Sequence, residues 1–297
     1  MANKKKGIIF AFMAAIISGI AIFYAKISVV KIDPLVLISL RNLVAGTIFT
    51  SILLINYKKN KLRILRVNEL IKLIIIGLLG GAIPFYLFFT GLKLTNAITA
   101  NFIHKTMFVW VAVFGLIFLH EKLNRYLSIS FIFILIANLF LFPKNFSIGK
   151  GEIMILLATI LWSAENIILK KINHNFSASL IGAFRMGFGA ICLLTAVAAN
   201  NKINLIFSLN PNQITVIIVG GTILFFYVYT WLSALKYAPA TLVTMVLTFS
   251  IVVGNILNGS FAGVKLLAVD IFTSIFLILA AGLALTKIIP RKIVSSS

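Results

Sequence analysis

Five ionisable residues stand inside long apolar stretches of this 297-residue chain: Arg41, His104, Lys105, Glu165 and Arg185. A charge in the core of a bilayer costs at least about 2.5–3.5 kcal/mol, so an ionisable side chain kept there is a functional-site hypothesis by default. The sequence therefore predicts a polar site enclosed by apolar helices. Such a site would take a charged or polar ligand.

Glu165 is the one acidic member of this group, and its depth resembles that of Arg185. It lies about five residues before the basic pair Lys170–Lys171, while Arg185 lies about seven residues into the next apolar stretch. This spacing allows an ion pair between the two. Two roles for Glu165 stay open: it carries a proton that couples transport, or it is the structural partner of Arg185.

Arg41 and Lys105 form a second group, at similar depth in the other half of the membrane. Apolar stretches of the first half of the chain contain no carboxylate that could neutralise them, so an anionic ligand is expected to do so. Asn101 and His104 lie within one helical turn of Lys105, a cluster too polar to face lipid. The alternative for both arginines is a tether between helices, and for His104 a packing role.

Aromatic residues could line a cavity for an organic ligand, although packing is the alternative for each of them. Together with the polar residues beside Glu165, they complete the candidate site. The predicted substrate-binding residues are Arg41, Asn101, His104, Lys105, Trp162, Asn166, Arg185, Tyr229 and Trp231, with Glu165 as the proton-coupling candidate.

The stretches that carry these residues are long enough to cross a bilayer as helices. Apolar residues make up 61% of the chain and charged residues 11%, which excludes a soluble protein. About 20 apolar residues span the hydrocarbon core, and such continuous runs must be helical. We expect an all-α integral membrane protein with ten transmembrane helices, at residues 7–27, 34–56, 70–91, 97–118, 126–142, 151–169, 178–199, 212–234, 240–260 and 266–286.

Basic residues set the expected orientation. The chain has 27 Lys and Arg against 6 Asp and Glu, but it has too little polar surface for a nucleic-acid-binding face. With the N-terminus inside, 17 basic residues fall in inner segments, 7 in outer segments and 3 within spans. Since cytoplasmic loops retain Lys and Arg, both termini are predicted to be cytoplasmic in a multi-pass protein of the cell membrane.

The two halves of the chain repeat one another. Gly7 and Arg41 recur 144 residues later as Gly151 and Arg185. The pairs Gly80–Gly81 and Gly220–Gly221 also recur, and small residues at such positions favour close helix packing, with a hinge as the alternative. We therefore expect two five-helix repeats, 7–142 and 151–286. Because five is odd, the repeats should be inverted, an architecture typical of transporters with alternating access.

Several short motifs resemble those of a known family. They are GLKLTNAITAN between the third and fourth spans, its echo ALKYAPATLVT, and FLHEKL at the end of the fourth span. With the paired arginines, they resemble the EamA-domain members of the drug/metabolite transporter superfamily. That resemblance implies a secondary transporter, more often an exporter. A proline common in the fourth and ninth helices of the family is absent, and Val264 stands where the second repeat would match Glu121.

The ligand expected from these patterns is a small polar or anionic organic metabolite, with protons as the candidate coupling ion. A membrane-embedded enzyme on lipid-linked substrates and a passive channel are the alternatives. The chain has no phosphate-binding Gly-rich loop with Lys, no HExxH motif and one cysteine, so we expect neither a bound cofactor nor a metal site. The pattern does not determine the oligomeric state.

Overall fold

The computed structural model describes residues 2–29, 32–60, 65–95, 97–143, 146–261, 263 and 265–286, and over these residues the chain is helical without strands. In the first half, the helices are α1 (Ala2–Val29), α2 (Pro34–Asn60), α3 (Val67–Ile76), the π-helix η1 (Gly77–Ala82), α4 (Ile83–Leu92), α5 (Ala97–Lys105), α6 (Met107–Phe118) and α7 (Arg125–Phe140). In the second half they are α8 (Lys150–Ile172), α9 (Ala178–Gly182), the π-helix η2 (Ala183–Phe188), α10 (Gly189–Ala199), α11 (Ile203–Phe207), α12 (Pro211–Tyr237), α13 (Ala240–Leu247), α14 (Ser250–Phe261) and α15 (Ala268–Thr286).

Each of the ten expected spans contains at least one helix. Within the described residues, eight segments are long and apolar enough to cross a membrane, whereas α7 and α15 are apolar but shorter. Ten crossings therefore stay a prediction. Val264 and the basic residues Lys31, Lys61, Arg63, Lys144, Lys287, Arg291 and Lys292, used in the sequence argument, lie outside the described residues.

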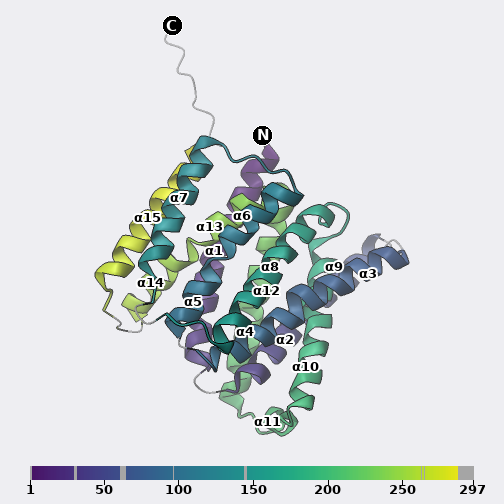
Figure 1. Cartoon of the computed structure of the whole chain (residues 1–297). Coiled ribbons are helices and arrows are strands. Elements are labelled where there is room, and N and C mark those ends of the chain that lie inside the picture. The colour runs from purple at the N-terminus through teal and green to yellow at the C-terminus, as the bar shows by residue number, and fades with distance from the viewer. Residues whose placement is uncertain are drawn as a thin grey trace.

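The helices pack across the two halves of the chain. In Figure 1, α7 and α15 run side by side at one edge of the bundle, and α1 packs along α12 near the middle. The start of α1 and the end of α15 lie toward the same end, which we call the N-terminal end. The end of α12 belongs to it as well, because the Lys6 ammonium lies 5.1 Å from the centre of the Tyr237 ring.

Two of the expected spans are interrupted, which corrects the prediction of continuous helices over 97–118 and 240–260. The first breaks between α5 and α6 at Thr106, and the second between α13 and α14 at Thr248. The Thr106 hydroxyl donates to the Ile103 carbonyl at 2.7 Å, and the Thr248 hydroxyl donates to the Met245 carbonyl at 2.6 Å. Hydroxyls that bond a carbonyl of the preceding turn compete with the helical pattern, so these breaks form without proline.

The recurring glycine pairs are sites of close packing, as the sequence predicted. A Cβ added to Gly81 would collide with the Arg185 carbonyl oxygen, and one added to Gly221 would lie 3.0 Å from the Arg41 carbonyl oxygen. Each pair thus holds a helix of its own half against the second helix of the other half. Absence of a side chain is what permits this distance between backbones.

Candidate functional site

The centre of the candidate site is a buried ion pair. Nε of Arg185, in η2, lies 2.5 Å from Oε1 of Glu165, in α8, and its Nη2 donates to Oε2 at 3.0 Å. Both side chains are almost entirely enclosed. The ion pair expected from their depth is therefore confirmed, in the two-bond geometry that a guanidinium and a carboxylate form best.

The first half of the chain supplies one wall of this pair. A Cβ at Gly80, in η1, would collide with the Glu165 carboxylate, so only glycine leaves room for it. The indole of Trp162 donates from Nε1 to the Gly80 carbonyl at 3.2 Å. Both η1 and η2 are single π-helical turns, a distortion that is frequent at functional sites. The pair thus lies where the two halves meet.

Aromatic rings from α12 cover the pair on another side. The guanidinium carbon of Arg185 lies 4.9 Å from the centre of a Trp231 ring, within the range of a cation–π contact. Trp231 donates from Nε1 to Oδ1 of Asn166 at 3.3 Å, and Tyr227 stacks nearly parallel to Trp231. We call Trp162, Glu165, Asn166, Arg185 and Trp231 the central cluster. The structure brings together these five predicted residues.

His104 joins the edge of this cluster through packing. Its ring centre lies 5.2 Å from that of Trp162 and 5.1 Å from that of Phe88. The buried Nδ1 has no hydrogen-bond partner in the part of the chain that the structure describes. An unpaired buried nitrogen beside the cluster leaves one hydrogen-bonding position open to a ligand or water.

Arg41 lies against the second half, in α2, and is buried. Its Nη2 donates to the Gly220 carbonyl at 3.4 Å, a long bond, while its Nε has no hydrogen-bond partner among the described residues. No ion pair of Arg41 occurs among them either. Its neighbour Asn42 donates to the Gly81 carbonyl at 3.1 Å. Arg41 thus keeps unused hydrogen-bonding capacity inside the bundle.

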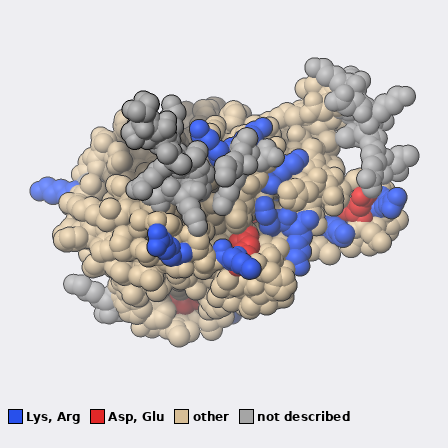
Figure 2. Space-filling view, turned by 90° about the horizontal axis from the view of Figure 1, so that it is seen from above, with Lys and Arg blue, Asp and Glu red and all other residues tan. Residues whose placement is uncertain are grey.

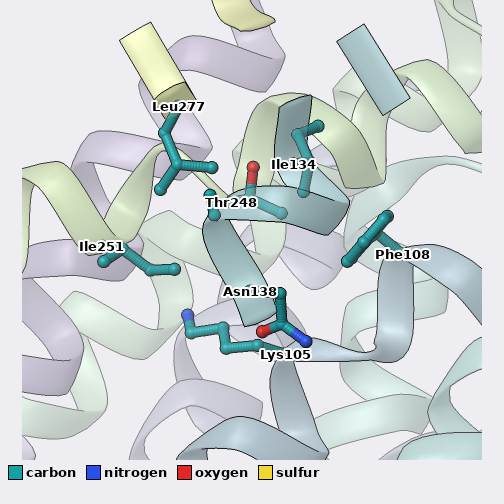
Figure 3. Close-up of a pocket in the computed structure, with 8 residues that line it drawn as sticks. Lys105, Phe108, Ile134, Asn138, Thr248, Ile251 and Leu277 are labelled. Atoms are coloured by element: carbon teal, nitrogen blue, oxygen red, sulfur yellow. The ribbon is translucent and has the colours of Figure 1, made fainter. Parts of the chain in front are cut away.

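Lys105, which the sequence places at a depth similar to that of Arg41, has other neighbours. Its Nζ lies 3.4 Å from the Ser250 hydroxyl, at the start of α14, and beside a small cavity that Arg41 does not line (Figure 3). A common site for Arg41 and Lys105 therefore stays a prediction.

Asn101 and Tyr229 lie outside the central cluster. Asn101 is exposed at the surface of α5, and Tyr229 is 38% exposed on α12, where its ring stacks near Phe225. Their predicted role in substrate binding stays a prediction. Among the described residues, no group of three His, Cys, Asp or Glu side chains could hold a metal ion.

Sequence reasoning did not find the contacts that fix the connection between α12 and α13. The Glu121 carboxylate accepts from the backbone N–H groups of Ala240 and Thr241 at 2.7 and 3.1 Å, at the first turn of α13. Lys170 donates to the carbonyls of Leu235 and Ala238 at 2.8 and 2.7 Å. A negative group at a helix start and a cation at a helix end both suit the helix dipole. The conspicuous charge of Glu121, beside an apolar stretch, was the available signal.

The corresponding connection at the opposite end, between α4 and α5, is held by other groups. Asp33 accepts from Lys93 at 3.2 Å and from Lys202 at 2.6 Å, and Thr95 donates to Glu152. Partial burial opposes ionisation of Asp33, but the hydrogen bonds from Lys202 and Lys93 outweigh it, so its pKa lies below the ordinary value. These ion pairs are partly exposed to solvent.

Comparison with known proteins agrees with this arrangement. One solved structure, described only as the crystal structure of a protein, has a TM-score of 0.75 and 14% identity to this chain, over 95% of this chain and 98% of its own. None of the curated proteins compared matches. The family model of the EamA-like transporter family matches twice, at residues 5–142 and 149–286. The chain therefore belongs to the EamA-like transporter family, whose members are membrane transporters of the drug/metabolite transporter type.

Proposed function

We propose that this membrane transporter moves a small polar or anionic organic metabolite by alternating access, as a secondary active transporter of the cell membrane. The single observation that carries the proposal is the position of the central cluster. Glu165 and Arg185 belong to the second family match, whereas Gly80, which encloses the carboxylate, belongs to the first. Movement of one repeat against the other would therefore remodel the cluster, as alternating access requires.

The proposed ligand is polar or anionic because the bundle contains cationic groups with unused hydrogen-bonding capacity. Arg41 has one long hydrogen bond, and Lys105 has one to Ser250. Trp162, Asn166 and Trp231 supply aromatic surface and an amide close to the ion pair. Apolar walls with a few polar groups are typical of sites for small organic molecules.

The proposed orientation has ten crossings, two inverted repeats and both termini in the cytoplasm. Figure 2 looks onto the N-terminal end, where Lys and Arg are widespread and Asp and Glu are few. Such a basic face is expected on the cytoplasmic side. A reporter fused after Ser297 that is accessible only from outside would contradict this orientation. Export is the proposed direction, as the family resemblance implies.

Transport by purified protein in sealed proteoliposomes tests the proposal. A panel of labelled organic anions and neutral metabolites is first screened by thermal shift, because a ligand that binds only the native state stabilises it. A secondary transporter should accumulate the selected ligand against its gradient when a proton gradient is applied, and should exchange it without one. A channel would only equilibrate it, and an enzyme would convert it in detergent without any compartment.

A further inference from the structure

Pro84 lies inside the third span of the first repeat, as the second residue of α4, and it is buried. A proline within a helix has no N–H for the carbonyl four residues before it, and its ring crowds that carbonyl. Here that carbonyl belongs to Gly80, in the π-helix η1. Ala82, between the two, has φ −121° and ψ −73°, outside the helical range. The proline therefore accounts for the distortion at η1, and it leaves the Gly80 carbonyl without its α-helical donor.

Side chains of two other helices bind the carbonyls of this distorted segment. α4 packs along α8 (Figure 1), and Trp162 of α8 donates from Nε1 to the Gly80 carbonyl at 3.2 Å. Asn42, in α2, donates to the next carbonyl, that of Gly81, at 3.1 Å. All four of these residues are buried. A buried carbonyl needs a donor, so Trp162 supplies from the second repeat what Pro84 removes from the first.

The corresponding helix of the second repeat, α12, lacks this break. It contains no proline after Pro211 and is a single helix. Gly220 is the counterpart of Gly80, and Leu224, four residues later, keeps the N–H that bonds its carbonyl in an α-helix. The Arg41 guanidinium donates to the Gly220 carbonyl at 3.4 Å. The side-chain bond is thus the shorter one where the helical donor is missing.

We infer that Pro84 is a positioning residue of the central cluster. By removing the helical donor of the Gly80 carbonyl, it creates the acceptor that fixes the Trp162 indole across the contact between the repeats. The next residue, Phe85, has its ring centre 5.1 Å from that of Trp162 and 6.0 Å from the guanidinium carbon of Arg185. The break therefore orients both a hydrogen bond and an aromatic wall beside the ion pair. This inference deepens the proposed function, and it rests on that function only where the cluster is taken as the ligand site.

Indole proton–nitrogen NMR spectra of the full-length protein in detergent test the inference. The chain has three tryptophans, so Phe substitution of Trp110 and of Trp231 assigns two resonances and leaves the third to Trp162. Pro84→Ala supplies an N–H that competes for the Gly80 carbonyl. We expect the Trp162 indole proton to move upfield and to exchange with deuterium about tenfold faster, as loss of one buried hydrogen bond would give. The Trp110 resonance should not move, since that indole bonds a neighbouring hydroxyl.

A control and a second variant accompany this measurement. Pro211 is the exposed first residue of α12, where a helix does not use the missing N–H. Pro211→Ala should therefore leave the Trp162 resonance unchanged. Pro84→Gly also supplies the N–H and tolerates more backbone conformations than alanine, so it should move the Trp162 resonance in the same direction.

Melting temperatures give a second readout, which a loss of packing alone would not reproduce. Trp162→Phe removes the side-chain donor of the Gly80 carbonyl. When Pro84→Ala is also present, a helical N–H replaces that donor. Trp162→Phe should therefore lower the melting temperature less in the Pro84→Ala background than in the unchanged protein.

The inference would be overturned by an unmoved Trp162 resonance in Pro84→Ala and Pro84→Gly, or by failure of both variants to fold. An equal cost of Trp162→Phe with and without the proline would also overturn it. None of these measurements uses a substrate. The expected shifts in a protein that transports nothing would count against the proposed function alone. Transport by a protein whose Trp162 resonance does not move would count against this inference alone.

Discussion

Arg41 and Arg185 occupy equivalent positions of the two repeats, 144 residues apart, yet their surroundings differ. Arg185 pairs with Glu165 through two short contacts and lies over a Trp231 ring. Arg41 has one long bond to a backbone carbonyl, and no carboxylate contacts it among the described residues. The second repeat neutralises its buried arginine within the protein, whereas the first repeat leaves this to water or a ligand.

The α12–α13 and α4–α5 connections also differ in the groups that hold them. At the N-terminal end, Glu121 and Lys170 bind backbone groups on both sides of the α12–α13 connection. At the opposite end, the α4–α5 connection is held by ion pairs of Asp33 that are partly exposed and by the bond from Thr95 to Glu152. Bonds to buried backbone groups are worth more than exposed ion pairs. We therefore expect the α12–α13 connection to be the more firmly held of the two.

The largest expected effect follows from breaking the ion pair of the second repeat. Glu165→Gln leaves Arg185 buried without a counter-charge, which should lower the free energy of unfolding by about 3–5 kcal/mol. Arg41→Gln breaks no ion pair of the described residues and should lower the free energy of unfolding by about 1 kcal/mol. Thermal and denaturant unfolding in one detergent compares the two. The double change Glu165→Gln with Arg185→Gln should recover most of the loss.

The same variant separates the two roles of Glu165. If Glu165 carries the proton, the Glu165→Gln variant should still exchange substrate between two loaded compartments. It should not accumulate substrate when a proton gradient is applied. If Glu165 is only the structural partner of Arg185, the Glu165→Gln variant should be unstable, and Glu165→Gln with Arg185→Gln should restore stability. A well-folded variant that loses both activities equally would exclude the proton role.

The second effect concerns the glycines at the contact between repeats. Gly81→Ala places a methyl group against the Arg185 backbone, which cannot move without shifting η2, so stability should fall by about 1–3 kcal/mol. Gly254→Ala is the matched control, since an added Cβ there meets no atom within 4 Å. Equal stability of the two variants would show that the contact at Gly81 adapts easily.

Part of this architecture could be predicted from the sequence, because hydrophobicity and depth are properties of sequence. They indicated the ten helical stretches and allowed the pairing of Glu165 with Arg185. They did not give the breaks at Thr106 and Thr248, where a hydroxyl competes for a backbone carbonyl without the usual proline signal. Nor did they give the neighbours of Arg41 and Lys105, because depth does not determine the face of a helix.

The third prediction concerns the contact of Glu121 with the start of α13, at the N-terminal end. Glu121→Gln keeps one acceptor oxygen but loses the second and the negative charge at the start of α13, which should cost about 1–2 kcal/mol. The loosened end should also become more accessible. Labelling of a single cysteine introduced at Ala238, in a background with Cys192→Ser, should be faster in the variant than in its parent. An unchanged labelling rate would argue against a role for Glu121 in holding the α12–α13 connection.

The smallest effect is expected at the opposite end. The pKa of Asp33 lies below its ordinary value in the folded protein, so its ion pairs stabilise the fold above about pH 4 and this contribution is lost as pH falls further. Hydrogen bonding to Asp33 raises the pKa of Lys202, so that the pairs persist across neutral pH.

Asp33→Asn should lower the free energy of unfolding by about 0.2–1 kcal/mol at pH 7, since the pairs are partly exposed. Unfolding of both proteins at pH 7 and at successively lower pH should give a difference that narrows as pH falls through the pKa of folded Asp33, because the protonated carboxyl and the amide that replaces it are both neutral. A difference that does not narrow as pH falls would contradict a role for the charge of Asp33, because asparagine keeps the oxygen that caps α2.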